Sequence, residues 1–190
     1  MFMKFRVEDV VNITPDLFGV DIREAASKQL LDRYLNLYDE EMGYIIKIDD
    51  VDVDPLGKVV SEDGSSYHKV RFTAYTFKPF LNEIVEGEVV EITTFGVFIR
   101  IGPIDALLHI SQIMNDLVIV DTVQGLVRGK ETGKVLRIGD KVRARIIAIS
   151  PPRGITVLKV GLTCRGGLLG NLEWIEEHIK EVIKSGEAKT

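Results

Sequence analysis

The residues best suited to chemistry in this sequence are aromatic, cationic and imidazole side chains that fall within one short stretch. They are Phe95, Phe98, Arg100 and His109, with Gly96 between the two rings. Side chains alternate between the two faces of a strand, so Phe98 and Arg100 point the same way, and Phe95 can join them from the preceding turn. Exposed rings stack on bases of any sequence, and each stacked base contributes about 1–3 kcal/mol of binding free energy. The alternative is that both phenylalanines belong to the core.

Cations that suit phosphate groups are concentrated between residues 128 and 145, where only Glu131 and Asp140 oppose them. They are Arg128, Lys130, Lys134, Arg137, Lys141, Arg143 and Arg145. The last three alternate along one candidate strand and are predicted to contact phosphates. A solvated basic strand face is the alternative interpretation of the same pattern.

The net charge of −5 is unevenly distributed along the chain. Residues 1–81 hold 10 Lys/Arg against 15 Asp/Glu, whereas residues 82–190 hold 14 of each. The acidity therefore belongs to the first part of the chain. The overall sign does not exclude nucleic-acid binding by the second part.

Motifs that would indicate an enzyme do not occur at useful spacing. The histidines, His68, His109 and His178, are scattered, and no nucleophile–base pair or phosphate-binding glycine loop accompanies them. Aspartates alternate through 49–54, and a solvated acidic face is favoured over a cation site because no ligand loop follows. Cys164, the single cysteine, is interpreted as a small buried side chain rather than a reactive thiol. We therefore predict no catalytic residue, no metal site and no cofactor.

Five candidate strands follow residue 82, and no helical period spans them. They are Ile84–Ile92, Gly96–Ile101, Ala106–His109, Lys141–Ile149 and Thr156–Thr163. Five short strands with a long excursion between the third and the fourth are typical of a closed OB-type barrel. The excursion, 112–139, is predicted to be a basic loop, with an extra hairpin as the alternative. Helical spacing over 171–184 predicts a terminal helix that packs on the barrel or on a partner.

The first part of the chain is predicted to form a small α/β layer. Residues 3–8 and 67–77 have strand patterns, and a third strand over 44–54 changes phase near its middle, which indicates a bulge. Asp21 and Glu24 resemble a capping box at the start of a helix. The apolar stripe of this helix is Ile22, Ala25, Ala26, Leu30, Leu31, Tyr34, Leu35 and Tyr38.

These patterns together predict an α+β protein of two domains, 1–81 and 82–190. The first is an α/β domain, and the second is a five-stranded OB-type β-barrel with a terminal helix. Apolar runs stay far below the roughly 18 residues that a membrane span needs, and the N-terminus lacks the apolar core of a signal peptide. We therefore expect a cytoplasmic protein with no membrane partner.

Three spaced blocks in the second domain resemble the RNA-binding OB module that is repeated in the largest protein of the small ribosomal subunit. The blocks are, in order, 85–102, 107–111 and 138–149. In that family two phenylalanines and a histidine lie on the RNA-binding face, which implies Phe95, Phe98 and His109 here. The sequence departs from the family at the last turn, where Arg153 is the candidate substitute for the usual acidic residue and arginine.

The whole chain resembles the family formed by the seventh subunit of archaeal DNA-directed RNA polymerase, also designated E prime, and its counterpart, the seventh subunit of eukaryotic RNA polymerase II. The resemblance rests on the Thr-Pro-x-Leu-Phe-Gly turn at 14–19, the helix, the barrel and the closing stretch 160–174. It implies a truncated ribonucleoprotein-like first domain whose tip docks on the polymerase core near the clamp. By position, the tip residues are Pro15, Leu17, Phe18 and Gly19.

The same resemblance implies a non-catalytic subunit that forms a heterodimer with a small helical protein, the fourth polymerase subunit, also designated F. The resulting stalk is expected to guide single-stranded nascent RNA during transcription. A free RNA-binding factor of translation or RNA decay is the alternative, since such proteins share the barrel. A nuclease that carries the barrel as an accessory is disfavoured because the rest of the chain is too short for a catalytic domain.

Overall fold

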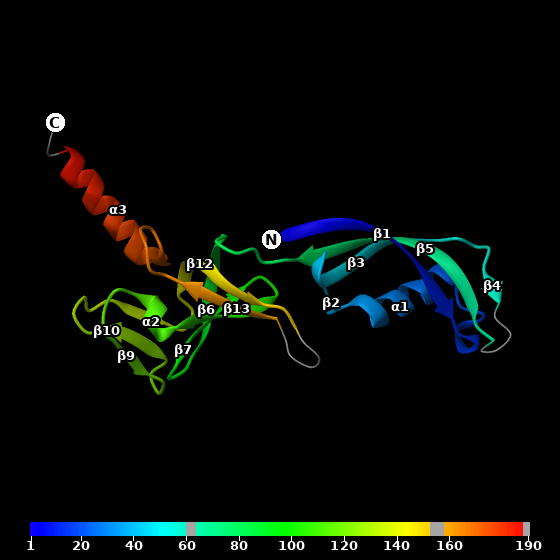
Figure 1. Ribbon diagram of the computed structural model, residues 1–190, viewed down its shortest axis with the longest axis horizontal. Helices are drawn as coiled ribbons and strands as arrows, with labels where there is room; N and C mark the ends of the chain where they lie inside the picture. Colours follow the sequence, from blue (N-terminus) through cyan, green and yellow to red (C-terminus); the bar gives the residue numbers. More distant parts are fainter. Residues whose placement is uncertain (60–63, 153–157, 188–190) are drawn as a thin grey trace. The chain divides into compact units, whose positions relative to one another are not determined.

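The computed structural model describes residues 1–59, 64–152 and 158–187. The chain forms two compact units, Met1–Lys78 and Pro79–Thr190 (Figure 1). Each unit has its own sheet and its own apolar core. Within the described ranges, no helix is long and apolar enough to cross a membrane.

The first unit is an antiparallel sheet with one helix, α1 (Ile22–Tyr34), against one of its faces. The sheet has the strand order β1-β5-β3-β2, and β4 pairs with β5. The strands are β1 Phe2–Ile13, β2 Tyr38–Asp39, β3 Gly43–Val53, β4 Lys58–Val59 and β5 Ser66–Phe77. Ala26 and Leu30 of α1 pack against Val11, Val70 and Phe72 of the sheet. This apolar layer confirms the predicted α/β architecture.

Helix α1 begins where the capping residues predict and ends earlier than its apolar stripe predicts. The Asp21 carboxylate accepts hydrogen bonds from the backbone N–H groups of Arg23 and Glu24, at 2.9 and 3.2 Å. At the other end Leu35 is extended and Asn36 has φ +65°, which turns the chain back toward the sheet. The prediction that Leu35 and Tyr38 continue the helix is therefore wrong, because the backbone N–H of Asn36 donates to Ile45 of β3 instead.

The phase change predicted in the third strand is a β-bulge. Asp49 lies opposite Thr73 and Asp52 lies opposite Arg71, so β3 carries one more residue than β5 over this interval. Asp50 has φ +50°, and its carboxylate accepts a hydrogen bond from the Thr73 hydroxyl at 3.2 Å. The extra residue keeps Ile48 before it and Val51 and Val53 after it on the core face.

The second unit contains a closed five-stranded barrel, as predicted. Its strands are β6 Ile84–Ile92, β7 Gly96–Ile101, β8 Ile104–His109, β12 Lys141–Ser150 and β13 Lys159–Thr163. They pair in the order β13-β8-β7-β6-β12, and β12 closes the barrel on β13. The pairing of β13 with β8 is parallel and the other four are antiparallel. Val97, Ile99 and Ile101 of β7 fill the barrel interior with no exposed surface.

The excursion between β8 and β12 is an ordered subdomain, so its prediction as a basic loop is wrong. A short helix, α2 (Ile110–Ile113), leads into a three-stranded antiparallel sheet. The strands are β9 Val118–Asp121, β10 Leu126–Gly129 and β11 Val135–Arg137. Strands of three or four residues carry too little alternation for the sequence pattern to reveal them.

The chain ends in the predicted helix, α3 (Leu172–Glu187), which follows a short strand, β14 (Gly170–Asn171). The Asn171 side-chain oxygen accepts a hydrogen bond from the backbone N–H of Glu173 at 2.9 Å, and Ile175 is buried. Beyond this first turn the apolar side of α3 is exposed at Ile179, Val182 and Ile183. Only the beginning of the helix therefore packs on its own unit.

Cys164 is buried at the end of β13, as its sequence context predicts, and burial raises the pKa of its thiol to about 12. A raised pKa keeps the thiol protonated, so at pH 8 only about one molecule in ten thousand carries the reactive thiolate. We expect alkylation by iodoacetamide in the native protein to be less than about 1% of the rate in the urea-unfolded protein. Similar rates in both states, followed by mass spectrometry, would show that the thiol is accessible.

Candidate nucleic-acid interface

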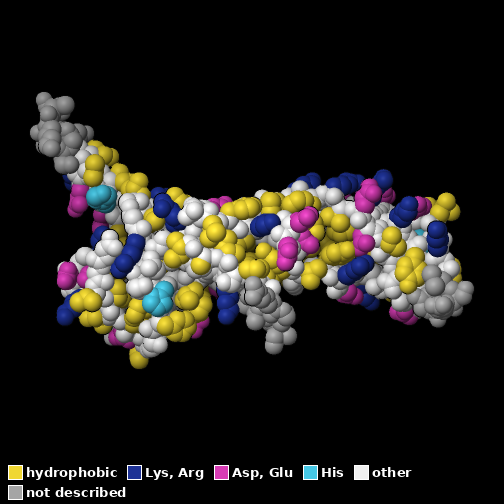
Figure 2. Space-filling model, viewed as in Figure 1, with side chains coloured by type: hydrophobic (Ala, Val, Ile, Leu, Met, Phe, Trp, Pro, Cys, Tyr) yellow, Lys and Arg dark blue, Asp and Glu magenta, His cyan; other side chains and the backbone are white. Residues whose placement is uncertain are grey.

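Phe95, Phe98 and His109 lie together on the outer face of β7 and β8. The rings of Phe95 and Phe98 meet edge to face, with centroids 6.1 Å apart. Phe95 is 50% exposed, Phe98 is partly buried and His109 is exposed. On the face shown in Figure 2, a histidine lies beside hydrophobic side chains over α2 and β7. The alternative that both phenylalanines are core residues is therefore excluded.

The backbone of the β6–β7 turn sets the positions of these rings. Val97 and Ile99 point into the barrel, so the intervening Phe98 must point outward. Gly96 lies opposite His109, and a Cβ at Gly96 would stand 2.7 Å from the Leu108 carbonyl oxygen. This close approach brings the start of β7 against the end of β8. Both rings and the imidazole consequently share one edge of the barrel.

His109 is held in one orientation by the residue two positions after it. Its Nδ1 accepts a hydrogen bond from the Ser111 backbone N–H at 3.2 Å and lies 2.8 Å from the Ser111 hydroxyl. Because Nδ1 accepts, the proton of the neutral ring is on Nε2. An exposed imidazole with its Nε2–H available is able to stack on a base and donate a hydrogen bond to it.

Arg100 lies next to Phe98 on the same face, but its charge is already matched. Its Nε and Nη2 atoms donate to the two carboxylate oxygens of Asp105, at 2.8 and 3.0 Å. This hydrogen-bonded pair raises the pKa of Arg100 above its ordinary value. Arg100 therefore borders the aromatic face without contributing an uncompensated cation.

The cations predicted on the fourth barrel strand are not brought to the aromatic face. Lys141, Arg143 and Arg145 lie on the outer face of β12, and β6 separates that strand from β7. Arg143 is also paired with Glu86, whose Oε1 lies 2.8 Å from Nε and 2.7 Å from Nη2. Arg153, the remaining predicted cation, lies outside the described residues.

Leu107 and Lys159 lie on the same outer face of the barrel, and neither is among the residues predicted from the sequence. Leu107 lies directly opposite Phe98, and Gly161 of β13 lies beside Leu107. Lys159 is two residues before Gly161 on the same strand face and is exposed. The parallel pairing of β13 with β8 places Lys159 level with Asp105, at the end of this face that carries Arg100. No pattern within one strand reveals such a pairing.

The predicted docking tip is a turn that exposes an aromatic ring. Pro15–Leu17 forms a single turn of 3-10 helix, and the N–H of Phe18 donates to the Pro15 carbonyl at 3.2 Å. Gly19 has φ +106°, a conformation that side-chain-bearing residues rarely adopt. Phe18 is 52% exposed. The alternative that this ring is buried within its own unit is excluded.

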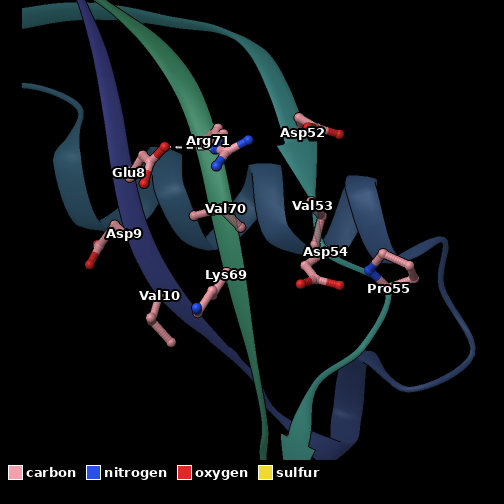
Figure 3. Close-up of a pocket in the computed structure, with 10 residues that line it drawn as sticks. All are labelled: Glu8, Asp9, Val10, Asp52, Val53, Asp54, Pro55, Lys69, Val70 and Arg71. Atoms are coloured by element: carbon pink, nitrogen blue, oxygen red, sulfur yellow. Dashed lines mark hydrogen bonds and ion pairs between the residues drawn. The ribbon is translucent and has the colours of Figure 1, made fainter.

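Surface grooves occur on the first unit, where they are lined by paired charges. One of about 540 Å³ crosses β1, β5 and β3 on the face opposite α1 (Figure 3). Glu8 and Arg71 form an ion pair of 2.7 Å across it, and Asp52 and Lys69 also line it. Across the described residues, no group of three or more His, Cys, Asp or Glu side chains is arranged to hold a metal ion. The groove in Figure 3 is therefore lined largely by charged side chains, of which Glu8 and Arg71 are paired.

Comparison with known proteins accounts for both units. The family model of the S1 RNA binding domain matches residues 78–160, and that of the SHS2 domain found in the N terminus of Rpb7p/Rpc25p/MJ0397 matches residues 8–64. DNA-directed RNA polymerase subunit Rpo7 of Saccharolobus shibatae is 37% identical over 93% of this chain and 98% of that protein. Rpo7 of Sulfolobus acidocaldarius is 34% identical over 97% of this chain and 100% of that protein. The chain belongs to the Rpo7/Rpb7 family of RNA polymerase subunits.

The Rpo7/Rpb7 family extends to eukaryotes, as the sequence resemblance implied. RNA polymerase II subunit RPB7 of Saccharomyces cerevisiae is 31% identical over 52% of this chain and 61% of that protein. Membership in this family accounts for the first unit as well as for the barrel. The chain is therefore an RNA polymerase subunit with an S1 RNA-binding domain.

Proposed function

We propose that this member of the Rpo7/Rpb7 family is non-catalytic and binds single-stranded nascent RNA on the outer face of β7 and β8. The observation that carries the proposal is the grouping of Phe95, Phe98 and His109 on one solvent-facing edge of a barrel whose interior is fully packed. Rings at a packed edge are already fixed, so stacking costs them little conformational entropy. Binding of the emerging transcript would support initiation and elongation.

The chemistry of this face favours an unpaired strand over a duplex. Bases expose their ring faces only when they are unstacked, and aromatic side chains then replace the lost stacking partner. Phe95 and Phe98 offer two such rings, and Leu107 extends the apolar surface beside them. Lys159, which is exposed on the outer face of β13, would neutralise a phosphate of the same strand. Recognition would therefore be tolerant of base sequence.

The first unit is proposed to dock on the polymerase core near the clamp through the tip around Phe18. A half-exposed aromatic ring on a turn has the form of an interface anchor. The small helical protein that serves as the fourth polymerase subunit is proposed as the heterodimer partner. The exposed apolar side of α3, at Ile179, Val182 and Ile183, supports a partner because apolar stripes on a helix are normally covered.

Alanine at Phe18 is expected to weaken retention of the polymerase core about tenfold to thirtyfold, because truncating an interface anchor costs roughly 2 kcal/mol. The measurement is affinity capture with the tagged chain at moderate salt, with quantitative mass spectrometry of the large polymerase subunits. Leu37→Ala is the matched control, since Leu37 is 47% exposed in the same unit and precedes Tyr38, which pairs with Tyr44 at the end of the sheet far from the tip.

Capture with the wild-type chain tests the proposed function itself. Recovery of the large polymerase subunits together with one small helical protein is the expected result. Recovery of ribosomal or RNA-decay components without polymerase would contradict the proposed function. Equal retention of the core by Phe18→Ala and Leu37→Ala would show that docking uses another surface.

A further inference from the structure

The small sheet between β8 and β12 presents two arginines on one face. Arg128 lies opposite Val135, and Leu126 lies opposite Arg137, so the two arginines are diagonal neighbours on the same side of the β10–β11 pair. The other side of this sheet carries Val127, which is fully buried. The face with the arginines is therefore the one that meets solvent, and both residues are exposed.

The carboxylates of three aspartates around this sheet accept hydrogen bonds within it, whereas no described residue donates one to the carboxylate of the nearby Glu131. Asp116 accepts hydrogen bonds from the N–H groups of Glu131 and Thr132, and the Thr132 N–H lowers the pKa of Asp116. Asp121 accepts from the N–H groups of Val123 and Gln124, at 3.0 and 2.9 Å. Asp140 accepts from the Arg137 N–H and from the Asn171 side chain.

Among the described residues, no carboxylate pairs with the cations of the same subdomain. Arg128, Lys130 and Arg137 form no ion pair with any residue that the structure describes. Lys134 lies over the Trp174 ring, 5.5 Å from its centroid. Arg128 and Arg137 therefore remain available to an anion on this face, which they share with Asp121, opposite Leu126.

The subdomain stands at the same end of the barrel as the aromatic face. Helix α2 follows His109 directly, and the Leu117 carbonyl just beyond it accepts a hydrogen bond from the backbone N–H of Lys130 at 2.8 Å. At the other end of the subdomain, the backbone N–H of Gly139 donates to the carbonyl of Val89. Val89 lies in the second half of β6, which precedes the turn that contains Phe95. The small sheet therefore adjoins the end of the β7–β8 face that carries Phe95 and His109.

We propose that Arg128 and Arg137 bind the phosphates of single-stranded RNA that continues past the β7–β8 face. This inference rests on the proposed RNA binding by the barrel and adds a second contact region to it. Guanidinium groups form paired hydrogen bonds with phosphate oxygens. Ile119, which lies opposite Arg128 on β9 and is 54% exposed, supplies apolar surface beside Arg128, on the side away from Arg137. The small sheet thus lengthens the site without reading bases.

The test is the salt dependence of binding for two oligouridylates, one of about 4 nucleotides and one of about 16, the range that an OB barrel accommodates. For the long RNA, Arg128→Gln with Arg137→Gln is expected to reduce the slope of log affinity against log salt by about 1.4, because each phosphate contact on a single strand contributes about 0.7. The short RNA should bind the variant as it binds the wild type. Arg128→Lys with Arg137→Lys should keep most of the slope.

Arg23→Gln with Lys28→Gln is the control, since it removes the same charge from α1 in the other unit. An unchanged slope for the long RNA would overturn the inference, and so would an equal loss for both RNAs, which would indicate a change in the barrel itself. The proposed function has a separate readout. If the wild type binds neither RNA, the barrel site fails, and the extension fails with it.

Discussion

Replacing Phe98 and His109 together by alanine is expected to weaken binding of single-stranded RNA by about 2–4 kcal/mol, roughly thirtyfold to a thousandfold. Each ring offers a stacking surface, and Phe98 also supports Phe95 through an edge-to-face contact at 6.1 Å. Removing both leaves Phe95 without its neighbour and leaves the base without the Nε2–H donor of His109. The measurement is fluorescence anisotropy with a labelled oligouridylate at fixed salt.

The matched control is Phe80→Ala with His178→Ala, which removes the same residue types from exposed positions elsewhere in the same unit. It should leave RNA affinity within about twofold of the wild type. The thermal midpoint of the Phe98/His109 variant should fall only slightly, since neither side chain contributes to the barrel interior. Unchanged affinity would show that RNA binds elsewhere, with the β12 cations Lys141 and Arg145 as the next candidates.

The fold was largely predictable because strong periodicity marks its long elements. β6 and β12 alternate buried and exposed residues over most of their length, and a one-residue shift would expose Val85 and Val142. The extent of α1 was less predictable. Leu31 and Leu35 continue the helical spacing, yet they are 42% and 39% exposed. Tertiary hydrogen bonds to β3, which no local pattern contains, end this helix.

The candidate site was predictable only where it depends on one strand and its turn. Phe98 and Arg100 fall on one face by alternation alone, and that relation is correct. Charge compensation was not visible, because the pairing of Arg100 with Asp105 depends on the register of β7 against β8. The position of Lys159 beside β8 depends on barrel closure, which joins strands about 50 residues apart in the sequence. The sequence therefore identifies the residue types of this site better than it identifies which of its charged side chains lack an ion-pair partner.

Gly87 shows how closely strands β6 and β7 of the barrel approach each other. It lies on β6 between Val85 and Val89, both of which point into the barrel. A Cβ at Gly87 would stand 2.3 Å from the Arg100 carbonyl oxygen and 2.7 Å from Cγ2 of Ile99. The obstructing atom is backbone and belongs to a paired strand, so no side-chain rotation relieves the contact. Relief requires β6 and β7 to separate.

Gly87→Ala is therefore expected to reduce the free energy of unfolding of the barrel by about 3 kcal/mol or more, which raises its unfolded fraction more than a hundredfold. Trp174 is the single tryptophan of the chain and lies in this unit, so its fluorescence in a urea titration follows the barrel. Gly167→Ala is the control, because a Cβ there meets nothing within 4 Å and should change stability by less than about 0.5 kcal/mol. The RNA affinity of Gly87→Ala should fall in proportion to the folded fraction. Strand β7 carries Phe98, and the added methyl group forces β7 away from β6. If Gly87→Ala has the same urea midpoint as the wild type, the close contact between β6 and β7 is contradicted.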